Sequence, residues 1–472
     1  MQICGMNKDT HDFGLIGLGV MGRNFILNVV DHGFSASGLD LDNEKVSALE
    51  EEASGKKVLS TTRIEDFVAS LSTPRVIMML VPAGGPVDSV IEDLLPHIEK
   101  GDIIIDGGNS HFDDTDRRYD YLKEKGYNFM GIGVSGGAKG ARLGPSMMPG
   151  GDADVYKRIQ PVFEAVAAKV NGEPCVTYLG PKSAGNYVKM VHNGIEYSMM
   201  QLISESYDFL KSVGGLTNDE LEEVFTKWNK GRLASFLVEI TSEIFAKKDD
   251  LGDGYLVDAI LDKAKQKGTG KWTSQHALDL GIPIPAIDIS VTMRGLSSQK
   301  QNRIKASDMY RGPGVQAMDK SKAIELAEAS LYFAFITSYS QGLSLLAAVS
   351  EEKAYDLNMA NIAKIWRGGC IIRASLLEDI RKAFADDSKL SNLLLSPFFS
   401  SELSKSQAAM REMLIAAIGS GIALPGHSTC LAYFDAFRSS RLPTNLIQAQ
   451  RDHFGSHTYE RIDKEGIFHT EW

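Results

Sequence analysis

Short apolar runs alternate with amphipathic stretches along the first third of the chain. The runs predict strands at residues 13–16, 34–39, 76–81, 102–105 and 129–133. Between them, apolar residues at helical spacing predict helices at residues 23–32, 43–52, 64–71, 87–99 and 115–125. Strands that alternate with helices of this length indicate a parallel, doubly wound α/β sheet with helices on both faces.

The pattern changes near residue 182, where long helical periodicities replace the strand signals. Helices are predicted through residue 202 and at residues 221–228, 233–245, 323–346 and 408–418. Past about residue 437 the chain stops resembling packed helix and becomes a polar, aromatic tail, whose composition suggests that it lies on a second subunit. We therefore predict three parts, an α/β domain, a large all-α domain and a C-terminal tail, with bounds 1–181, 182–436 and 437–472.

A glycine motif follows the first predicted strand. Gly17, Gly19 and Gly22 form G-x-G-x-x-G directly before a helix. The first glycine allows a tight turn, the second lets the backbone approach a pyrophosphate, and the third allows close packing of helix on strand. Asp40 ends the second strand about 20 residues further on, where a ribose-binding acid belongs. This context predicts a dinucleotide site.

Three glycine-rich loops follow the later strands, at residues 81–85, 106–110 and 134–142. Each one alone is most simply a turn. Because ligands of a doubly wound sheet bind at the carboxyl ends of its strands, the three loops together predict one cleft floor with exposed backbone N–H donors.

The helix that opens the second domain, residues 185–197, carries the main candidate chemistry. At about 100° per residue, Lys189, His192, Asn193 and Glu196 share one face. Lys189 and Glu196 are two turns apart, about 10 Å, so a small polyhydroxylated molecule fits between them. The alternative is a solvated charged face. Gly194, which is costly within a helix, favours close approach of another backbone or a ligand.

Basic residues also cluster outside this helix. Residues 265–272 form a basic, glycine-broken loop that is suited to hold a phosphate, with a plain surface loop as the alternative. Spacing alone assigns no role to Arg294 or to residues 366–369. The tail places Arg451 and His457 six residues apart.

Composition excludes several classes of protein. The chain has 472 residues with 43% apolar residues, enough for about three domains. Its net charge of -11 argues against a nucleic-acid or membrane partner. The first 13 residues lack the apolar core of a secretory signal, and the four cysteines show no metal-ligand spacing. We therefore expect a cytoplasmic protein with no metal site.

The sequence resembles the 6-phosphogluconate dehydrogenases, the decarboxylating enzymes of the pentose phosphate pathway. The similarity covers essentially the whole chain, in the motifs GLIGLGVMG, DGGNS, GVSGG, GPSMMPGG, KMVHNGIEY, QKGTGKWT, WRGGCIIR and QAQRDHFGSHTYE. It implies a Rossmann-type dinucleotide-binding domain, a helical substrate and dimerisation domain, and a tail that reaches into the partner subunit of a homodimer.

The resemblance also implies roles for individual residues. Lys189 would be the general base and Glu196 the acid that protonates the product enediol. The substrate 6-phosphogluconate would be held through its carboxylate and hydroxyls by Asn109, Ser135, Gly136, Gly137, His192 and Asn193. Its phosphate would be held by Tyr197, Lys267, Thr269 and Arg294, with Arg451 and His457 from the other subunit. The cofactor would contact Gly17, Gly19, Val20, Met21, Gly22, Asp40, Val81, Ala83 and Asn109.

The residues after the second strand address the choice of nicotinamide. Family members that use NADP resemble one another in Asn-Arg-Thr at this point, whereas this chain has Asp40, Leu41 and Asp42. A carboxylate accepts hydrogen bonds from a free ribose 2′-hydroxyl and repels a 2′-phosphate. We therefore predict NAD in preference to NADP, with Lys45 as the nearby cation able to offset that repulsion. Two further departures, at residues 81–82 and 138–139, also lie on the cofactor side.

Two other functions fit parts of the pattern. A β-hydroxyacid dehydrogenase that acts on a smaller acid shares a related helix but needs no phosphate-binding residues. A dinucleotide-binding sensor without catalysis keeps the glycine motif but has no need of Lys189 and Glu196, and both are present.

Overall fold

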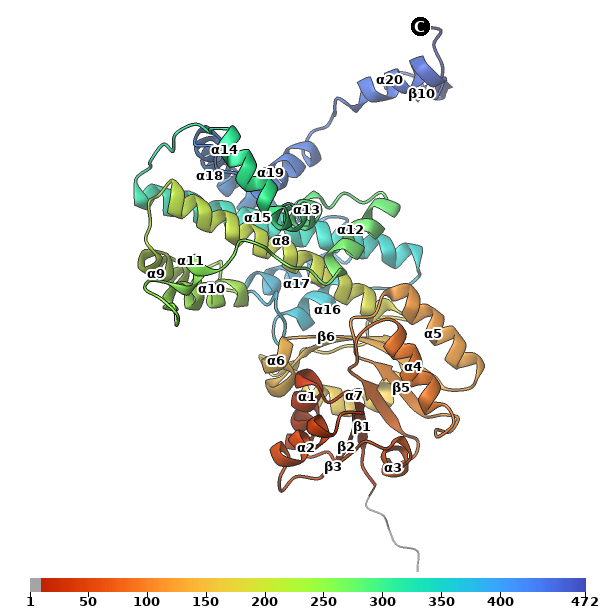
Figure 1. Ribbon diagram of the computed structural model, residues 1–472. Helices are drawn as coiled ribbons and strands as arrows, with labels where there is room; N and C mark the ends of the chain where they lie inside the picture. Colours follow the sequence, from red (N-terminus) through yellow and green to blue (C-terminus); the bar gives the residue numbers. More distant parts are fainter. Residues whose placement is uncertain (1–9) are drawn as a thin grey trace, which may run out of the picture.

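A seven-stranded sheet forms the first domain of the computed structural model, which describes residues 10–472 (Figure 1). The strand order is β3-β2-β1-β4-β5-β6-β7, and neighbours pair in parallel except β6 and β7, which are antiparallel. The strands are β1 Phe13–Ile16, β2 Ala36–Leu39, β3 Val58–Thr61, β4 Val76–Met79, β5 Ile103–Asp106, β6 Asn128–Ser135 and β7 Ser146–Gly151. The Rossmann-type class is confirmed, but the prediction of an all-parallel sheet was wrong at β7. That strand, with its Pro and two Gly residues, carries little strand propensity.

Helices cover both faces of the sheet. Alternate residues of the strands point to opposite faces, so Leu15 joins a core with Phe25 and Ile159, whereas Ile16 joins a core with Phe67 and Ile91. The helices are α1 Val20–Asp31, α2 Asn43–Glu52, α3 Ile64–Ala69, α4 Gly85–Leu94, α5 Phe112–Glu124, α6 Gly137–Leu143 and α7 Ala153–Val166. A short hairpin, β8 Lys169–Val170 and β9 Glu173–Pro174, follows.

The second domain is helical, as predicted. Its helices are α8 Ala184–Ser212, α9 Asn218–Trp228, α10 Phe236–Ala246, α11 Leu256–Ala259, α12 Thr269–Asp279, α13 Pro285–Ser298, α14 Lys300–Met309, α15 Lys320–Glu352, α16 Met359–Trp366, α17 Leu376–Asp386, η1 Leu393–Leu395, α18 Pro397–Gly419 and α19 Pro425–Phe437. Helices α8 and α15 pack together at the centre. Helix α15 is long and apolar enough to cross a membrane, but 78% of its most apolar window is buried, which is typical of a core helix.

The start of α8 is held against the sheet. A Cβ atom built on Gly185 would lie 2.0 Å from the carbonyl oxygen of Met148 on β7, and one on Gly133 of β6 would lie 2.3 Å from the Cβ of Lys189. Such distances require glycine, because real Cβ atoms do not approach so closely. The helix that carries the candidate chemistry is therefore positioned by direct backbone contact between the two domains.

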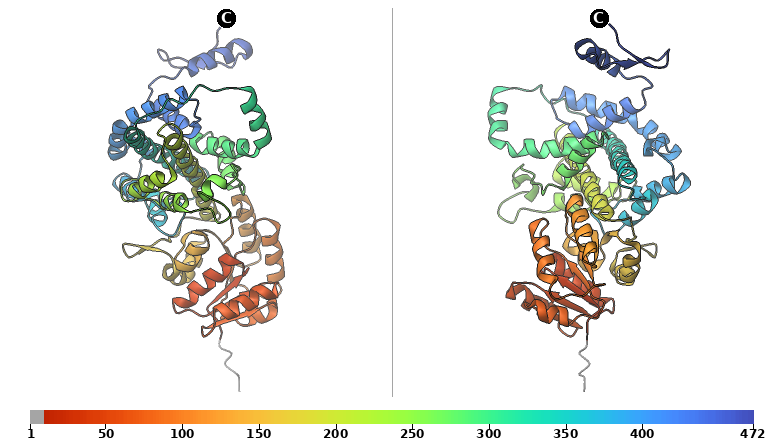
Figure 2. Two further views of the ribbon diagram at one scale, coloured as in Figure 1. Left: turned by 60° about the vertical axis from the view of Figure 1, so that its left-hand side comes forward. Right: turned by 90° about the vertical axis from the view of Figure 1, so that its right-hand side faces the viewer.

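The tail contains a helix that the sequence analysis did not predict, α20 Thr444–Gly455, and a small hairpin of β10 Tyr459–Glu460 with β11 Ile467–Phe468. Figures 1 and 2 show this unit extending away from the helical domain in every view. Apolar side chains of α20 are exposed, including Leu446 at 61% and Phe454 at 72%. Within the described residues the helix contacts the small hairpin and the end of the chain, and it does not pack on the helical domain (Figure 1).

Candidate active site

The glycine motif forms a cradle between β1 and α1. Gly17 has a φ of +99°, which an L side chain rarely adopts. A Cβ on Gly22 would lie 1.9 Å from the carbonyl oxygen of Gly17, whereas one on Gly19 would meet nothing within 4 Å. The three glycines therefore provide a turn, an open approach and close packing at the N-terminus of α1. These are the features that a pyrophosphate requires.

Asp40 at the end of β2 closes the cradle. Its Oδ2 accepts a hydrogen bond from the Leu18 amide (2.8 Å), and its Oδ1 accepts one from the Asp42 amide (3.0 Å). Lys45 forms ion pairs with Asp40 (3.4 Å) and Asp42 (3.7 Å). The side chain of Asp40 is 12% exposed, so its carboxylate remains open to one further donor on the solvent side.

The loops after β4, β5 and β6 meet the face of α8 in one cleft of about 740 Å³. This brings together most residues that were predicted for substrate and nicotinamide. The lining comprises Met21, Leu80, Val81, Pro82, Ala83, Gly107, Gly108, Asn109, Val134, Ser135, Gly136, Gly137, Lys189, Asn193, Glu196, Tyr197, Lys267, Thr269, Trp272 and Ile371.

Lys189 lies at the centre of this cleft and is 6% exposed. Its Nζ donates to Oδ1 of Asn193 (2.8 Å) and lies 3.4 Å from Nδ1 of His192. That Nδ1 is also 3.2 Å from Asn193 Oδ1. The other ring nitrogen, Nε2, lies 3.3 Å from the hydroxyl of Ser135. The network fixes the position of the amine and the orientation of the imidazole ring.

Electrostatics divide the two ends of this face into a base and an acid. Burial lowers the pKa of Lys189, although the charge of Glu196 opposes the shift. Burial raises the pKa of Glu196, against the charges of Lys189 and Arg294. Burial and the Lys189 charge hold the pKa of His192 well below its ordinary value. The cleft therefore holds an amine whose pKa is lowered and a carboxyl group whose pKa is raised, the directions that suit a base and an acid.

The far end of the cleft is basic and polar. The Arg294 guanidinium lies over the Tyr197 ring at 3.9 Å and donates to the Lys265 carbonyl at 2.8 Å. The Lys267 amide donates to the Tyr197 hydroxyl at 3.4 Å. The sequence predicted a loop over residues 265–272, but helix α12 already begins at Thr269, so a helix N-terminus adds a positive dipole end here.

Gly194 explains why α12 comes so close. A Cβ on Gly194 would lie 2.8 Å from Cγ2 of Thr273 on α12, and the Thr273 hydroxyl donates to the Met190 carbonyl at 3.0 Å. The sequence predicted close approach of a backbone or a ligand, and the structure shows a neighbouring side chain instead.

Residues 366–369, which spacing left unassigned, support the cleft from behind. The Gly369 carbonyl accepts from the Ser146 amide at 2.8 Å, and a Cβ on Gly136 would lie 2.5 Å from the same oxygen. The Trp366 ring meets the His192 ring edge-on at 5.6 Å. The segment therefore fixes the position of the Gly136 turn and of the His192 imidazole.

A buried ion-pair network that the sequence analysis missed supports the Asn109 loop. Asp106 accepts from the Gly108 amide (3.0 Å) and the Ser110 hydroxyl (2.6 Å), and the buried Arg118 links it to Asp88. Burial raises the pKa of Asp106 in spite of these partners. The apolar lining residues Trp272 and Ile371 were also missed, because apolar wall positions have no local signature.

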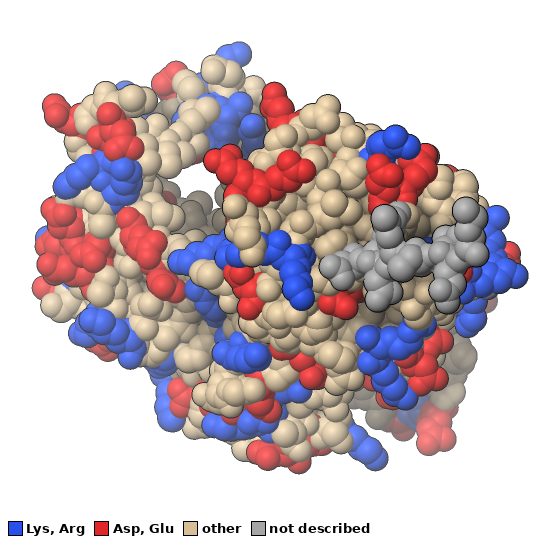
Figure 3. Space-filling model, turned by 90° about the horizontal axis from the view of Figure 1, so that it is seen from below, with Lys and Arg blue, Asp and Glu red and all other residues tan. Residues whose placement is uncertain are grey.

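Arg451 and His457 are the predicted site residues that the structure does not bring to the cleft. Both lie in the tail, which extends away from its own chain's cleft (Figure 1). Among residues 10–472, no group of three or more His, Cys, Asp or Glu side chains is arranged to hold a metal ion. The face of the first domain seen in Figure 3 intermixes Lys and Arg with Asp and Glu and shows no single-sign patch.

Comparison with known proteins decides the family. Residues 12–180 match the NAD binding domain of 6-phosphogluconate dehydrogenase, and residues 185–472 match the 6-phosphogluconate dehydrogenase C-terminal domain. The chain belongs to the 6-phosphogluconate dehydrogenase family. The recognition made from the sequence motifs is thereby confirmed, together with the order of a Rossmann-type domain and a large helical domain.

Relatives in this family match over nearly their whole length. The "6-phosphogluconate dehydrogenase, NADP(+)-dependent, decarboxylating" of Bacillus subtilis is 53% identical, with coverage of 97% of this chain and 98% of that protein. The "6-phosphogluconate dehydrogenase, decarboxylating 1" of Spinacia oleracea is 52% identical, with coverage of 97% of each. The Plasmodium falciparum 6-phosphogluconate dehydrogenase structure, described with cofactor NADP+ and with substrate 6-phosphogluconate, superposes with a TM-score of 0.95 at 45% identity, covering 98% and 100% of the chains. These names do not support NAD as the main cofactor of the family, so NAD preference stays a prediction for this chain.

Proposed function

We propose that the protein oxidises and decarboxylates 6-phospho-D-gluconate to D-ribulose 5-phosphate and CO2, with hydride transfer to a nicotinamide dinucleotide. The observation that carries this proposal is the pair of buried groups with opposed pKa shifts, Lys189 and Glu196, on one face of α8. The pair lies between the cradle for a dinucleotide and the basic end of the cleft, which suits a phosphate. A smaller, unphosphorylated acid would leave that basic end without a partner.

The residues of the cleft divide the chemistry between them. Lys189 takes the proton from the C3 hydroxyl of the substrate, and a bound nicotinamide dinucleotide, held by the glycine cradle and Asp40, supplies the hydride acceptor. Oxidation at C3 gives a β-keto acid, which loses CO2 because the carbonyl accepts the electron pair. Lys189 then returns a proton to that oxygen, and Glu196 in its neutral form protonates C1 of the enediol.

The test follows reduced nicotinamide and CO2 release with 6-phosphogluconate against gluconate. We expect Lys189→Met to abolish turnover and to retain substrate binding in calorimetry, because the methionine keeps the packing and removes the amine. Lys211→Met is the matched control, since Lys211 lies at the end of the same helix and pairs with the exposed Asp258. Near-normal turnover in Lys189→Met, or equal rates with gluconate, would refute the proposal.

We further propose that the protein prefers NAD. Asp40 lies at the ribose end of the cradle, and Lys45 is already shared between Asp40 and Asp42. A 2′-phosphate would therefore meet two carboxylates and one cation, whereas a 2′-hydroxyl would donate to Asp40. Leu41, where NADP-using members are expected to carry Arg, is 90% exposed and offers no positive charge.

We also propose a homodimer in which Arg451 and His457 complete the phosphate end of the partner's cleft. The extended tail and its exposed apolar helix support this arrangement. Mixing inactive Lys189→Met subunits with Arg451→Ala subunits, which we expect to bind 6-phosphogluconate weakly, should restore activity at low substrate concentration, because each hybrid dimer contains one intact site. If the subunits exchange and activity does not return, the shared site is wrong.

A further inference from the structure

A single carboxylate organises the tail. Asp452 on α20 has no exposed surface, although the residues around it are largely exposed. Its Oδ1 accepts from the Thr458 amide (2.9 Å) and from Nδ1 of His469 (2.8 Å). Its Oδ2 accepts from the Thr470 amide and from Nε1 of Trp472, both at 3.0 Å. A buried carboxylate is costly unless such donors surround it, so this one ties the end of the chain to α20.

The same carboxylate constrains the turn that carries His457. Ser456 and Thr458, on either side of His457, have φ of +49° and +57°, a conformation that residues other than glycine rarely adopt. The Ser456 amide donates to the Asp452 carbonyl at 2.9 Å, and the Thr458 amide donates to the Asp452 side chain. Two left-handed residues that flank one histidine persist only where the surroundings over-determine them, which is typical of functional sites.

Gln448 connects this turn to Arg451. Its Nε2 donates to the Thr458 carbonyl at 2.5 Å, and its Oε1 accepts from Nη1 of Arg451 at 3.1 Å. Gln448 lies one helical turn before Arg451, so its amide spans from the guanidinium to the turn. The guanidinium and the backbone turn that carries the imidazole are thus both held in one hydrogen-bonded frame within the tail.

We infer that Asp452 and Gln448 are positioning residues that preset Arg451 and His457 to receive a dianionic phosphate, with residues 469–472 closing the frame. The inference rests on the proposed sharing of the tail between subunits. A frame formed before the ligand arrives reduces the ordering cost of binding, so the tail enters the partner's cleft with its guanidinium and imidazole already oriented. Neither positioning residue needs to touch the substrate.

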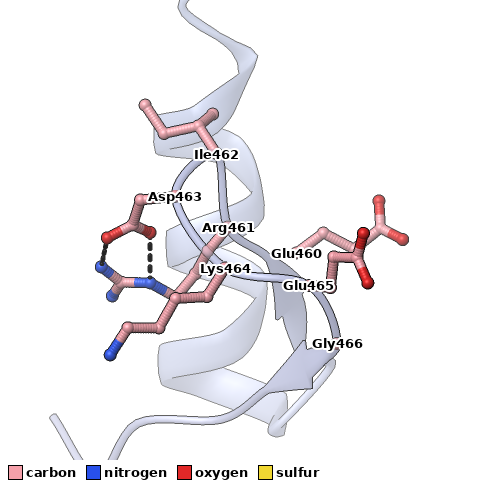
Figure 4. Close-up of a pocket in the computed structure, with 7 residues that line it drawn as sticks. All are labelled: Glu460, Arg461, Ile462, Asp463, Lys464, Glu465 and Gly466. Carbon is pink, nitrogen blue, oxygen red and sulfur yellow. Dashed lines mark hydrogen bonds and ion pairs between the residues drawn. The ribbon is translucent and has the colours of Figure 1, made fainter.

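The test begins with Asp452→Asn. The amide keeps the shape of the side chain but turns one acceptor oxygen into a donor that faces two donors. We expect the KM for 6-phosphogluconate to rise about tenfold or more, since each 1.4 kcal/mol is a factor of ten, with a smaller change in kcat. Dimer mass by light scattering and NADH binding should stay at wild-type values. Asp463→Asn is the matched control, because Asp463 pairs only with the exposed Arg461 at the tip of the same hairpin (Figure 4).

A double-mutant cycle separates positioning from general damage to the tail. If Asp452 acts through the turn that carries His457, then Asp452→Asn should raise KM little further in a His457→Ala background. Additive effects, or loss of the dimer in Asp452→Asn, would overturn the positioning role. If Arg451→Ala itself leaves KM unchanged, the shared phosphate site fails. If Arg451→Ala raises KM and a dimeric Asp452→Asn does not, the positioning inference alone fails.

Discussion

Replacing Asp40, Leu41 and Asp42 by Asn, Arg and Thr is expected to move the cofactor preference from NAD toward NADP. The position of Leu41 is 90% exposed, so an arginine fits there without repacking and can pair with a 2′-phosphate. Asp42 caps α2 by accepting from the Glu44 amide at 3.0 Å, and threonine also caps helices. The local fold therefore tolerates the change.

The size of the expected change in cofactor preference follows from the charges near Asp40. At about 5 Å and an effective dielectric constant of about 20, one pair of unit charges interacts by about 3 kcal/mol. Lys45, shared between the two carboxylates, offsets roughly one of them, and solvent screens the rest. Removing both carboxylates should thus relieve about 1 to 3 kcal/mol, and a charge-assisted hydrogen bond from Arg adds about 1.5 to 3 kcal/mol. Together these change the ratio of kcat/KM values by about two to four orders of magnitude.

The substitution also has a structural cost. Asp40 accepts from the Leu18 amide with one oxygen and from the Asp42 amide with the other. Asparagine offers a single acceptor, so one amide loses its partner, which costs about 1 kcal/mol or more. We expect a Tm lower by a few degrees, and Leu41→Arg alone should raise NADP use without that cost.

The assay compares kcat/KM for NAD and NADP at saturating 6-phosphogluconate and at two salt concentrations, because added salt screens exposed charges. Glu50→Gln is the control, since it removes an exposed negative charge from α2 away from the cradle. A wild-type protein with the higher kcat/KM for NADP would refute the reasoning. So would a triple variant with an unchanged ratio.

Two predictions concern the acid and the base. The pKa of Lys189 is lowered by burial and that of Glu196 is raised by burial. The base must lose its proton and the acid must keep its own, so kcat, which includes the late protonation by Glu196, should fall at both low and high pH. Glu196→Gln should remove the fall at high pH from this profile. A variant that still shows the fall at high pH would contradict the assignment of Glu196 as the acid. In the same variant, burst kinetics should show oxidation and CO2 release at near-normal rates with slow formation of ribulose 5-phosphate.

The sequence predicted those parts of the site whose geometry is local. The spacing of Gly17, Gly19 and Gly22 and the shared helical face of Lys189 and Glu196 depend on a few consecutive residues, so periodicity was sufficient. The antiparallel strand β7 and the link from Asp106 to Arg118 depend on partners distant in sequence. Nothing in the local pattern of either segment indicates them, because the residue type alone does not show whether an arginine is buried or exposed.

The tail also shows that contacts between residues distant in sequence could not be predicted. Helix α20 has a helical pattern, yet its large apolar side chains Leu446, Ile447 and Phe454 are mostly exposed, so its polar and aromatic composition resembled an irregular terminus. The role of Asp452 could not be predicted from the sequence, because its hydrogen-bond donors come from residues 458, 469, 470 and 472. Three of these residues follow the small hairpin, which returns the chain to α20.

The glycines between the domains explain why catalytic geometry is reproducible in a cleft built from loops. Gly133 approaches the Cβ of Lys189 and Gly185 approaches the Met148 carbonyl, so α8 touches the sheet through backbone and Cβ atoms, whose positions do not depend on a rotamer. A side chain at Gly133 would displace Lys189 along with the helix that carries Glu196. The distance between base and acid is internal to α8, whereas the distance from base to cofactor is set by this contact. Hydride transfer therefore depends on the packing of the domains more strongly than the later protonation by Glu196 does.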